Sequence, residues 1–261
     1  MALGDKINFV LNKQDAAITF VIGTGRSGTH WLGYTLAEHP DIRTTIESRR
    51  IFKLSTRMAL DASRKKNYLN TLIRRYKWQL FLSVPKMYLD KSHTNMWLAA
   101  DLKAAFPNAR FLGIERNPYS TVASMLVHKQ VAAWHSLWRQ FPVPNPFLGI
   151  SEKVAEKYDS LSLAQQCALR WQAHHQQMNA LRQSLGKDLF VIAYEEFATN
   201  TRAVLHDIEH FLTVSHATPI PEVKQESLDK WKKQLSDDDI RHIENIVGFP
   251  PDTPIPAQNH P

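Results

Sequence analysis

Cysteine is nearly absent from this chain. Of its 261 residues only Cys167 carries a thiol, so no disulfide can form within the chain, and a reducing compartment is expected. No apolar run is long enough to span a membrane, and the start of the chain, Met1–Lys6, shows no secretory signal. These absences predict a cytoplasmic protein without a transmembrane segment.

Acidic residues are outnumbered, and the formal net charge is +7. The excess is concentrated between Arg49 and Lys86, where eleven Lys or Arg accompany a single acid, Asp61. Such a stretch suits an acidic acceptor or peripheral contact with an anionic membrane surface, and a solvated helical face beside an active site would look the same. Positive charge favours anionic ligands without indicating nucleic acid, and we expect no nucleic-acid partner.

Short apolar segments rich in strand-forming residues alternate with helical patterns. Strands are expected at Ile18–Ile22, Met87–Asp90, Arg110–Ile114 and Leu189–Ala193. Helical periodicity follows at Ala99–Phe106, Tyr119–Lys129, Leu161–Leu185, Ala203–Leu212 and after Ser236. This alternation predicts a single α/β domain over residues 1–261, with a central parallel sheet flanked by helices in a P-loop-like topology. Ligands of such sheets bind beyond the carboxyl ends of the strands.

Residues 131–150 differ from the rest of the chain. They contain Trp134, Trp138, Phe141 and Phe147 together with three prolines. We interpret the segment as an aromatic loop stiffened by proline rather than a helix. It would form a lid, a wall for an acceptor, or a loop packed on the core.

Glycine is scarce as well, with nine in the chain, yet three of the nine fall between residues 23 and 28. Gly23, Gly25 and Gly28 let the backbone turn tightly after the first strand and approach a ligand closely. The helix that follows is expected to run to Glu38. Its free N–H groups and positive dipole end suit a phosphate.

The loop differs from a nucleoside-triphosphate loop of the form GxxxxGK[ST]. Thr29 and His30 stand where Lys and Ser or Thr would be, and the cation is instead Arg26. Hydrolysis of ATP or GTP with Mg²⁺ is therefore disfavoured, and no metal is expected to be required. A P-loop nucleotide kinase or other phosphotransferase is one alternative, and a non-catalytic nucleotide-binding protein is another.

A second anion site is expected after the strand at Arg110–Ile114. Arg116 lies just past this strand, and Asn117-Pro118 makes a turn that opens the next helix. Ser124 follows eight residues after Arg116, on that helix. A fixed cation and a hydroxyl donor at this spacing could hold one phosphate between them.

With both anion sites in place, the chain resembles the sulfotransferases that use 3′-phosphoadenosine 5′-phosphosulfate (PAPS). Within that family it is most similar to the tyrosylprotein sulfotransferase branch. The shared sequences are RSGTHWL at 26–32, HPD at 39–41, DLK at 101–103, FPNARFL at 106–112 and the Arg116–Ser124 pair. The resemblance implies transfer of a sulfuryl group from PAPS to a hydroxyl, with PAP as the product. The acceptor, whether small molecule, saccharide, lipid or peptide, is left unidentified.

The resemblance also implies a role for single residues. The 5′-phosphosulfate loop corresponds to Arg26, Ser27, Gly28, Thr29 and His30, although the family usually has Thr or Ser at the last of these. The 3′-phosphate pair corresponds to Arg116 and Ser124, and further cofactor contacts correspond to Tyr194 and Lys230. The catalytic glutamate corresponds to Glu47, and a lysine near the transferring group corresponds to Lys91.

These residue types match the chemistry of sulfuryl transfer. The attacking hydroxyl must lose a proton, so Glu47 is the expected general base. Negative charge grows on the leaving nucleotide, where Arg26, Lys91 and the loop N–H groups would stabilise it. An ion pair of Glu47 with Arg49 or Arg50 is the alternative.

A possible metal motif lies near the end of the chain. His206, Glu209 and His210 match an HxxEH pattern, but the surrounding apolar residues are typical of an ordinary packed helix. We do not interpret it as a zinc site.

Overall fold

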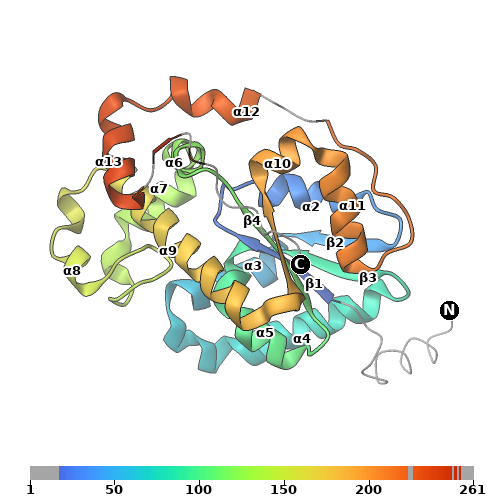
Figure 1. The fold of residues 1–261 in the computed structure, drawn as a ribbon. Coiled ribbons are helices and arrows are strands. Elements are labelled where there is room, and N and C mark those ends of the chain that lie inside the picture. Colours follow the sequence, from blue (N-terminus) through green and yellow to red (C-terminus); the bar gives the residue numbers. More distant parts are fainter. Residues whose placement is uncertain (1–17, 223–225, 249, 252, 254–261) are drawn as a thin grey trace.

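The structure is a computed structural model that describes residues 18–222, 226–248, 250–251 and 253. Its centre is a parallel sheet of five strands in the order β2-β3-β1-β4-β5. The strands are β1 (Ile18–Gly23), β2 (Ile42–Ile46), β3 (Met87–Lys91), β4 (Arg110–Glu115) and β5 (Leu189–Ala193). β1 is buried on both faces because helices cover the sheet on either side (Figure 1).

α-Helices of the described residues separate successive strands of the sheet, as the sequence predicts. They are α2 (Thr29–Ala37), α3 (Arg49–Leu60), α4 (Lys65–Ser83), α5 (Ala99–Ala105), α6 (Pro118–Leu126), α7 (Lys129–Ser136), α8 (Glu152–Ala155), α9 (Leu163–Leu185), α10 (Tyr194–Thr199), α11 (Thr201–Leu212), α12 (Glu226–Asp229) and α13 (Asp237–Val247). Single turns of 3₁₀ helix join several of them. None of the described helices is long and apolar enough to cross a membrane.

Alternate residues of β1 enter two different hydrophobic clusters. Phe20 packs with Tyr76, Phe106 and Phe111 on the face covered by α3, α4, α5 and the second half of α9. Val21 belongs to the opposite cluster, with residues of α2, α10 and α11. A third cluster joins α6, α7, α13 and the first half of α9. The sheet is therefore held by apolar burial on both faces.

Register places the carboxyl ends of the strands side by side. Val21 of β1 pairs with Lys91 of β3, and Ile46 of β2 pairs with the same lysine. Gly23 at the end of β1 pairs with Ile114 of β4. The glycine loop, the residue after β2 and the end of β3 consequently meet at one edge of the sheet, as expected for ligand sites of parallel sheets.

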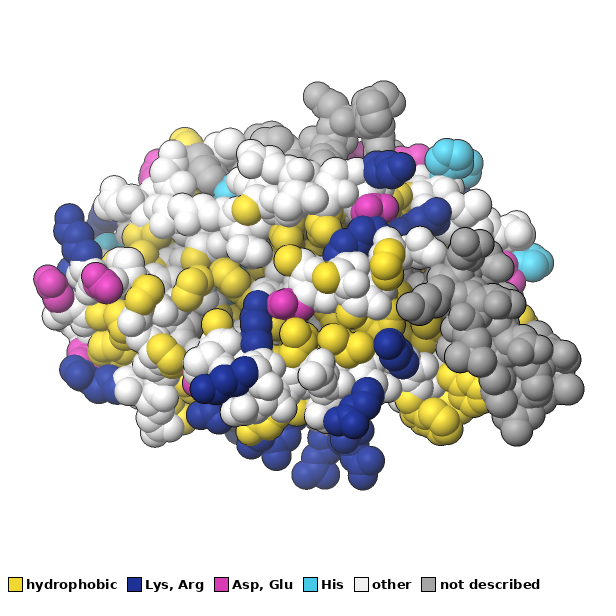
Figure 2. All heavy atoms as spheres, turned by 90° about the horizontal axis from the view of Figure 1, so that it is seen from below, with side chains coloured by type: hydrophobic (Ala, Val, Ile, Leu, Met, Phe, Trp, Pro, Cys, Tyr) yellow, Lys and Arg dark blue, Asp and Glu magenta, His cyan; other side chains and the backbone are white. Residues whose placement is uncertain are grey.

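The four predicted strands are confirmed, with ends shifted by one residue at most. β2 was not predicted, because its sequence, IRTTI, has no central apolar run and four of its five residues are only half-buried. The basic stretch forms α3 and α4, whose Lys and Arg side chains gather on the face seen from below in Figure 2.

The interpretation of residues 131–150 as a non-helical loop was wrong in its first part. α7 includes residues 131–136, and one 3₁₀ turn covers Trp138–Gln140. Val131, Trp134 and Trp138 are buried and follow a helical spacing, which packs them onto the third cluster. The prolines begin only after residue 141, and there the chain is irregular apart from one bridge between Asn145 and Ile150.

Candidate active site

The glycine-rich loop joins the end of β1 to the first turn of α2 (Figure 1). Gly28 directly precedes the helix with a φ of 98°, a left-handed conformation that glycine adopts readily. No side chain of the described residues caps the first N–H groups of α2. These donors therefore face outward at the positive end of the helix dipole, an arrangement that fits a phosphate.

Arg26 connects this loop to the predicted 3′-phosphate site. Its Nε donates a hydrogen bond to Oγ of Ser124 over 3.1 Å, although the two residues are 98 positions apart. Arg26 also has a φ of 79°, which costs an L-residue about 1–2 kcal/mol. Two residues predicted separately thus lie together.

Ser27 is held inside the loop. Its hydroxyl lies 2.6 Å from the carbonyl oxygen of Thr24 and 3.0 Å from that of Ile114. These contacts hold the loop against β4. Thr29 is buried as well, at the start of α2, and the roles of both residues toward a nucleotide stay predictions.

Arg116, Tyr194 and Ser227 form a second cluster, at the position of the predicted 3′-phosphate site. The Arg116 guanidinium lies 4.1 Å from the centre of the Tyr194 ring and donates to the carbonyl of Ser227. The Tyr194 hydroxyl lies 2.6 Å from Oγ of Ser227. Among the described residues, Nε of Arg116 is buried without a hydrogen-bond partner, so the cluster has an open donor.

The Tyr194 ring also packs on the glycine loop. A Cβ at Gly28 would lie only 2.3 Å from Cδ2 of Tyr194, so no other residue fits there. The loop and Arg116 therefore both pack against the same aromatic side chain.

Lys230 is exposed on the 3₁₀ turn Lys230–Lys233, which follows α12. This segment covers the start of α6, where Ser120 donates to the carbonyl of Leu228 over 3.3 Å and Trp231 packs on Tyr119. No described contact joins the Lys230 side chain to the pocket, and its cofactor role stays a prediction.

Glu47, Lys91 and His93 meet at the ends of β2 and β3. Glu47 accepts a hydrogen bond from Nζ of Lys91 at Oε1, and Nδ1 of His93 lies 3.0 Å from the same oxygen. The backbone N–H of Glu47 donates to the carbonyl of Lys91 over 2.8 Å. Nζ of Lys91 also lies 2.9 Å from Nδ1 of His30, whose side chain is half-exposed. The alternative partners of Glu47, Arg49 and Arg50, are not among these contacts.

Burial and mutual contact shift the pKa values of the three residues in this cluster. Burial alone would raise the pKa of Glu47, but His93 and Lys91 outweigh it and hold that pKa at about 2. Burial lowers the pKa of Lys91 to about 8 against the opposing effect of Glu47, and it lowers the pKa of His93 to about 4. At neutral pH the cluster holds a carboxylate, an ammonium and a neutral imidazole, with His93 donating its Nδ1–H.

Sequence reasoning missed His93 and Arg170. A pocket of about 50 Å³ is lined by the loop at Gly25, by the Glu47 cluster and by Arg170 of α9. His93 could have been found from its place two residues after Lys91, at a strand end. Arg170 gave no signal, because an arginine within a long helix is usually a surface residue.

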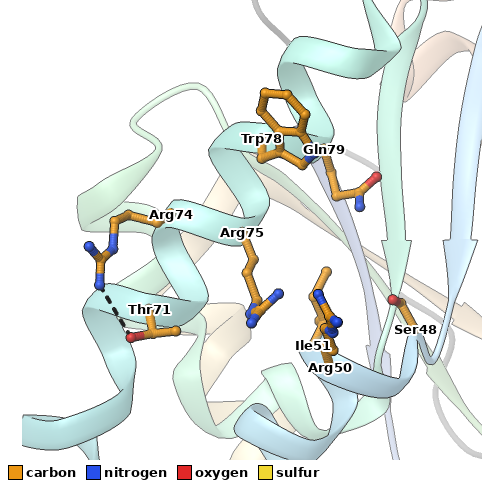
Figure 3. Close-up of a pocket in the computed structure, with 8 residues that line it drawn as sticks. All are labelled: Ser48, Arg50, Ile51, Thr71, Arg74, Arg75, Trp78 and Gln79. Atoms are coloured by element: carbon orange, nitrogen blue, oxygen red, sulfur yellow. Dashed lines mark hydrogen bonds between the residues drawn. The ribbon is translucent and has the colours of Figure 1, made fainter.

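A wider groove of about 440 Å³ opens between α3 and α4, next to Glu47 in sequence (Figure 3). Its lining includes Arg50, Arg74 and Arg75 with Trp78, and it contains no carboxylate. Arg74 donates to the hydroxyl of Thr71 over 3.5 Å, a long contact. The basic stretch therefore presents cations to the surface beside the site.

The HxxEH pattern is not assembled as a metal centre. Glu209 accepts a hydrogen bond from the backbone N–H of Thr218 over 2.6 Å, and the His206 side chain is exposed. Within the described residues, no group of three or more His, Cys, Asp or Glu side chains is placed to hold a metal ion.

A parallel sheet with a glycine loop, two cationic clusters and a carboxylate at one edge is an arrangement suited to binding an anionic group. The chain belongs to the sulfotransferase family, because a sequence profile of that family matches residues 19–218. The resemblance and the α/β fold predicted from the sequence are thereby confirmed.

The following similar proteins are distant from this chain in sequence. A protein-tyrosine sulfotransferase from Drosophila melanogaster is 23% identical, over 90% of this chain and 50% of that protein, so the chain spans about half the length of this curated relative. The sulfotransferase domain of the Synechococcus olefin synthase superposes with a TM-score of 0.57 at 15% identity, over 88% of this chain and 94% of that domain. Mouse sulfotransferase SULT7A1, solved with PAP, superposes with a TM-score of 0.51 at 17% identity, over 89% of this chain and 83% of that chain. At these identities the structures support the fold alone.

Proposed function

We propose that this protein transfers a sulfuryl group from PAPS to an acceptor hydroxyl and releases PAP. The observation that carries the proposal is the hydrogen bond from Arg26 to Ser124, which joins the two predicted phosphate sites into one surface. The uncapped end of α2 and the open Nε of Arg116 fit the two phosphates of this donor. The PAP bound to the mouse neighbour of the same fold supports this choice.

In the proposed reaction, the acceptor oxygen attacks sulfur in line with the departing phosphate oxygen. The O–S bond to the acceptor forms as the S–O bond to the nucleotide breaks. Glu47 takes the hydroxyl proton, and Lys91 with Arg26 stabilises the charge on the leaving phosphate. All three residues border the same pocket.

The pKa of Glu47 bears on its role as base. At about 2, this pKa makes Glu47 a weak proton acceptor while the Lys91 ammonium contacts it. We infer that a donor phosphosulfate draws Lys91 away from Glu47, which raises the basicity of the carboxylate. His93 keeps its hydrogen bond to Oε1 and holds the carboxylate in place during this exchange.

The acceptor remains a hydroxyl compound of unassigned type. The Drosophila relative, of which this chain covers half, is named for a protein-tyrosine acceptor. A cytoplasmic location stays part of the proposal, resting on the single cysteine.

The test is calorimetric titration of the protein with PAP, and with ADP in parallel, without Mg²⁺. We expect micromolar binding of PAP and much weaker binding of ADP, because only PAP carries the 3′-phosphate for Arg116 and Ser124. Arg116→Ala should lose PAP binding, whereas Glu47→Gln should keep binding and lose transfer from PAPS. Equal affinity for the two nucleotides, or transfer that requires ATP and Mg²⁺, would favour a phosphotransferase instead.

A further inference from the structure

Arg170 is a buried cation that the reaction described above does not use. Its side chain is 0% exposed, and Nε and both terminal nitrogens have no hydrogen-bond partner among the described residues. Burial lowers the pKa of Arg170 to about 10, so the guanidinium still carries its charge at neutral pH. Leaving such a group without an oxygen partner is strongly unfavourable.

Two aromatic rings pack against the guanidinium of Arg170. The ring centres of Phe147 and Trp134 lie 4.6 Å and 5.1 Å from its central carbon. These contacts stabilise a cation, yet the N–H groups lie in the guanidinium plane and need oxygen acceptors. The N–H edge is therefore the unsatisfied part.

That edge reaches the pocket beside the glycine loop. A Cβ placed on Gly25 would lie 3.6 Å from a terminal nitrogen of Arg170 and 3.1 Å from Nε2 of His93. Nε2 of His93 is also buried without a partner among the described residues. Two polar groups from different elements thus converge on one point while lacking partners.

The pocket offers Arg170 no counter-ion of its own. Glu47 is the one carboxylate in the pocket lining as described, and Lys91 and His93 hold the same oxygen of it. Asp and Glu are absent from the other pocket-lining residues. An incoming oxoanion would supply the missing acceptors.

We propose that Arg170 binds a carboxylate of the acceptor, so that the substrates of this sulfotransferase are compounds carrying a hydroxyl and a carboxylate. The proposal rests on the proposed function, since it places the carboxylate beside the hydroxyl that Glu47 deprotonates. The sulfuryl group of the donor is the other oxoanion that could reach Arg170. In the proposed function, the loop N–H groups, Arg26 and Lys91 already bind the donor. Arg170 instead extends from α9 and packs against aromatic rings, so we assign it to the acceptor.

The experiment uses the PAP-saturated protein and a matched pair of probes, 4-hydroxyphenylacetate and the uncharged 2-(4-hydroxyphenyl)ethanol, with acetate as the smallest probe. Calorimetry should show the acid binding about tenfold or more tighter than the alcohol. Arg170→Met should bring the ratio close to one, and Arg170→Lys should keep part of it. PAP affinity should stay unchanged in both variants. Arg139→Met, an exposed arginine of the neighbouring 3₁₀ turn, serves as the control and should behave as the unmodified protein.

Thermal unfolding separates binding from packing. Because methionine fills a similar volume without a charge, Arg170→Met should unfold at the same or a higher temperature. A lower unfolding temperature with an unchanged acid-to-alcohol ratio would make Arg170 a packing residue and overturn the proposal.

Other outcomes also decide the matter. The proposal would be overturned if the protein bound the acid and the alcohol with equal affinity. It would also be overturned if none of the three probes, acetate included, bound at all. Weaker PAPS binding in Arg170→Met with unchanged PAP binding would assign Arg170 to the donor sulfuryl group. If the protein fails to bind PAP at all, the proposed function fails, while acetate binding that depends on Arg170 would still establish the anion site.

Discussion

The candidate active site has two halves that are built differently. The loop half consists of Arg26, Gly28, Arg116, Ser124 and Tyr194, supplied by short motifs after β1 and β4 and by the start of α10. Its cations contact a hydroxyl, a carbonyl and a ring, and no carboxylate of the described residues forms an ion pair with them.

The strand-end half consists of Glu47, Lys91, His93 and Arg170. Its residues come singly from the ends of β2 and β3, from the 3₁₀ turn after β3 and from α9. It holds a tight ion pair and a cation with no acceptor. In the proposed function, the loop half would therefore act as a preformed anion receptor, while the strand-end half would change its pairing when a ligand enters.

The largest expected effect would sharpen this contrast in catalysis. Lys91→Met removes the ammonium of the strand-end half, and turnover should fall by about 10²–10³. PAP affinity should change little, because PAP lacks the sulfuryl group. Turnover is measured from rates at saturating PAPS, and PAP affinity is measured by calorimetric titration. Lys103→Met, which removes a lysine paired with Asp188, is the control. A large loss of PAP affinity in Lys91→Met would place Lys91 in the loop half instead.

The next variant would break the loop half. Gly28→Ala puts a Cβ against Tyr194 at a φ of 98°, so PAP affinity should fall by about 10- to 100-fold, or about 1.4–2.8 kcal/mol. Gly248→Ala is matched for strain, with a φ of 85° and nothing within 4 Å of the new Cβ. Calorimetry on both variants separates contact from backbone strain, and similar affinities in the two would show that the Tyr194 contact is unimportant.

The pH dependence of the two halves should differ. Lys91 acts in its charged form, and burial lowers its pKa to about 8, so the rate should fall by about tenfold per pH unit above that value. Lys91→Arg should remove this limb. Stability should change in the opposite direction. Between pH 8 and the ordinary lysine pKa of 10.5, the unfolded chain binds more protons at this position than the folded chain, so the contribution of Lys91 to stability rises with pH.

Rate profiles and unfolding temperatures across this range measure both trends. A flat rate profile would show that the charge of Lys91 is not required. PAP binding by the loop half should be much less sensitive to the same change, since its cations are arginines.

The smallest expected effect concerns the support of the strand-end half. Asp90 is buried beside Lys91 and accepts hydrogen bonds from Tyr76, Thr45 and Asn95, each at 3.0 Å. Tyr76→Phe removes one donor and should lower the free energy of unfolding by about 1 kcal/mol, with unchanged PAP affinity. Urea unfolding measures it, and a change in PAP affinity would show that the network reaches the loop half.

The two halves also differ in how far the sequence predicts them. The loop half can be predicted from short contiguous segments of the sequence. These are a strand followed by a glycine turn, and an arginine directly after a later strand, and each has a known physical role in binding anions. The roles of Glu47 and Lys91 were predicted only from the family resemblance. Glu47 follows β2, an edge strand whose sequence has little apolar character and was not predicted as a strand. Arg170 could not be predicted, because its burial depends on Trp134 and Phe147 from a segment whose helical part was itself misjudged.

The backbone at Arg26 and Glu47 has a consequence for how such a chain can change over generations. Arg26 and Glu47 are two of the three non-glycine residues with positive φ in the described part of the chain. Glycine adopts such a left-handed backbone conformation at a lower cost than other residues. A glycine at either position would relieve backbone strain and remove the functional side chain. Selection for stability alone would therefore favour glycine at both positions, so arginine and glutamate are expected there only while their side chains are useful.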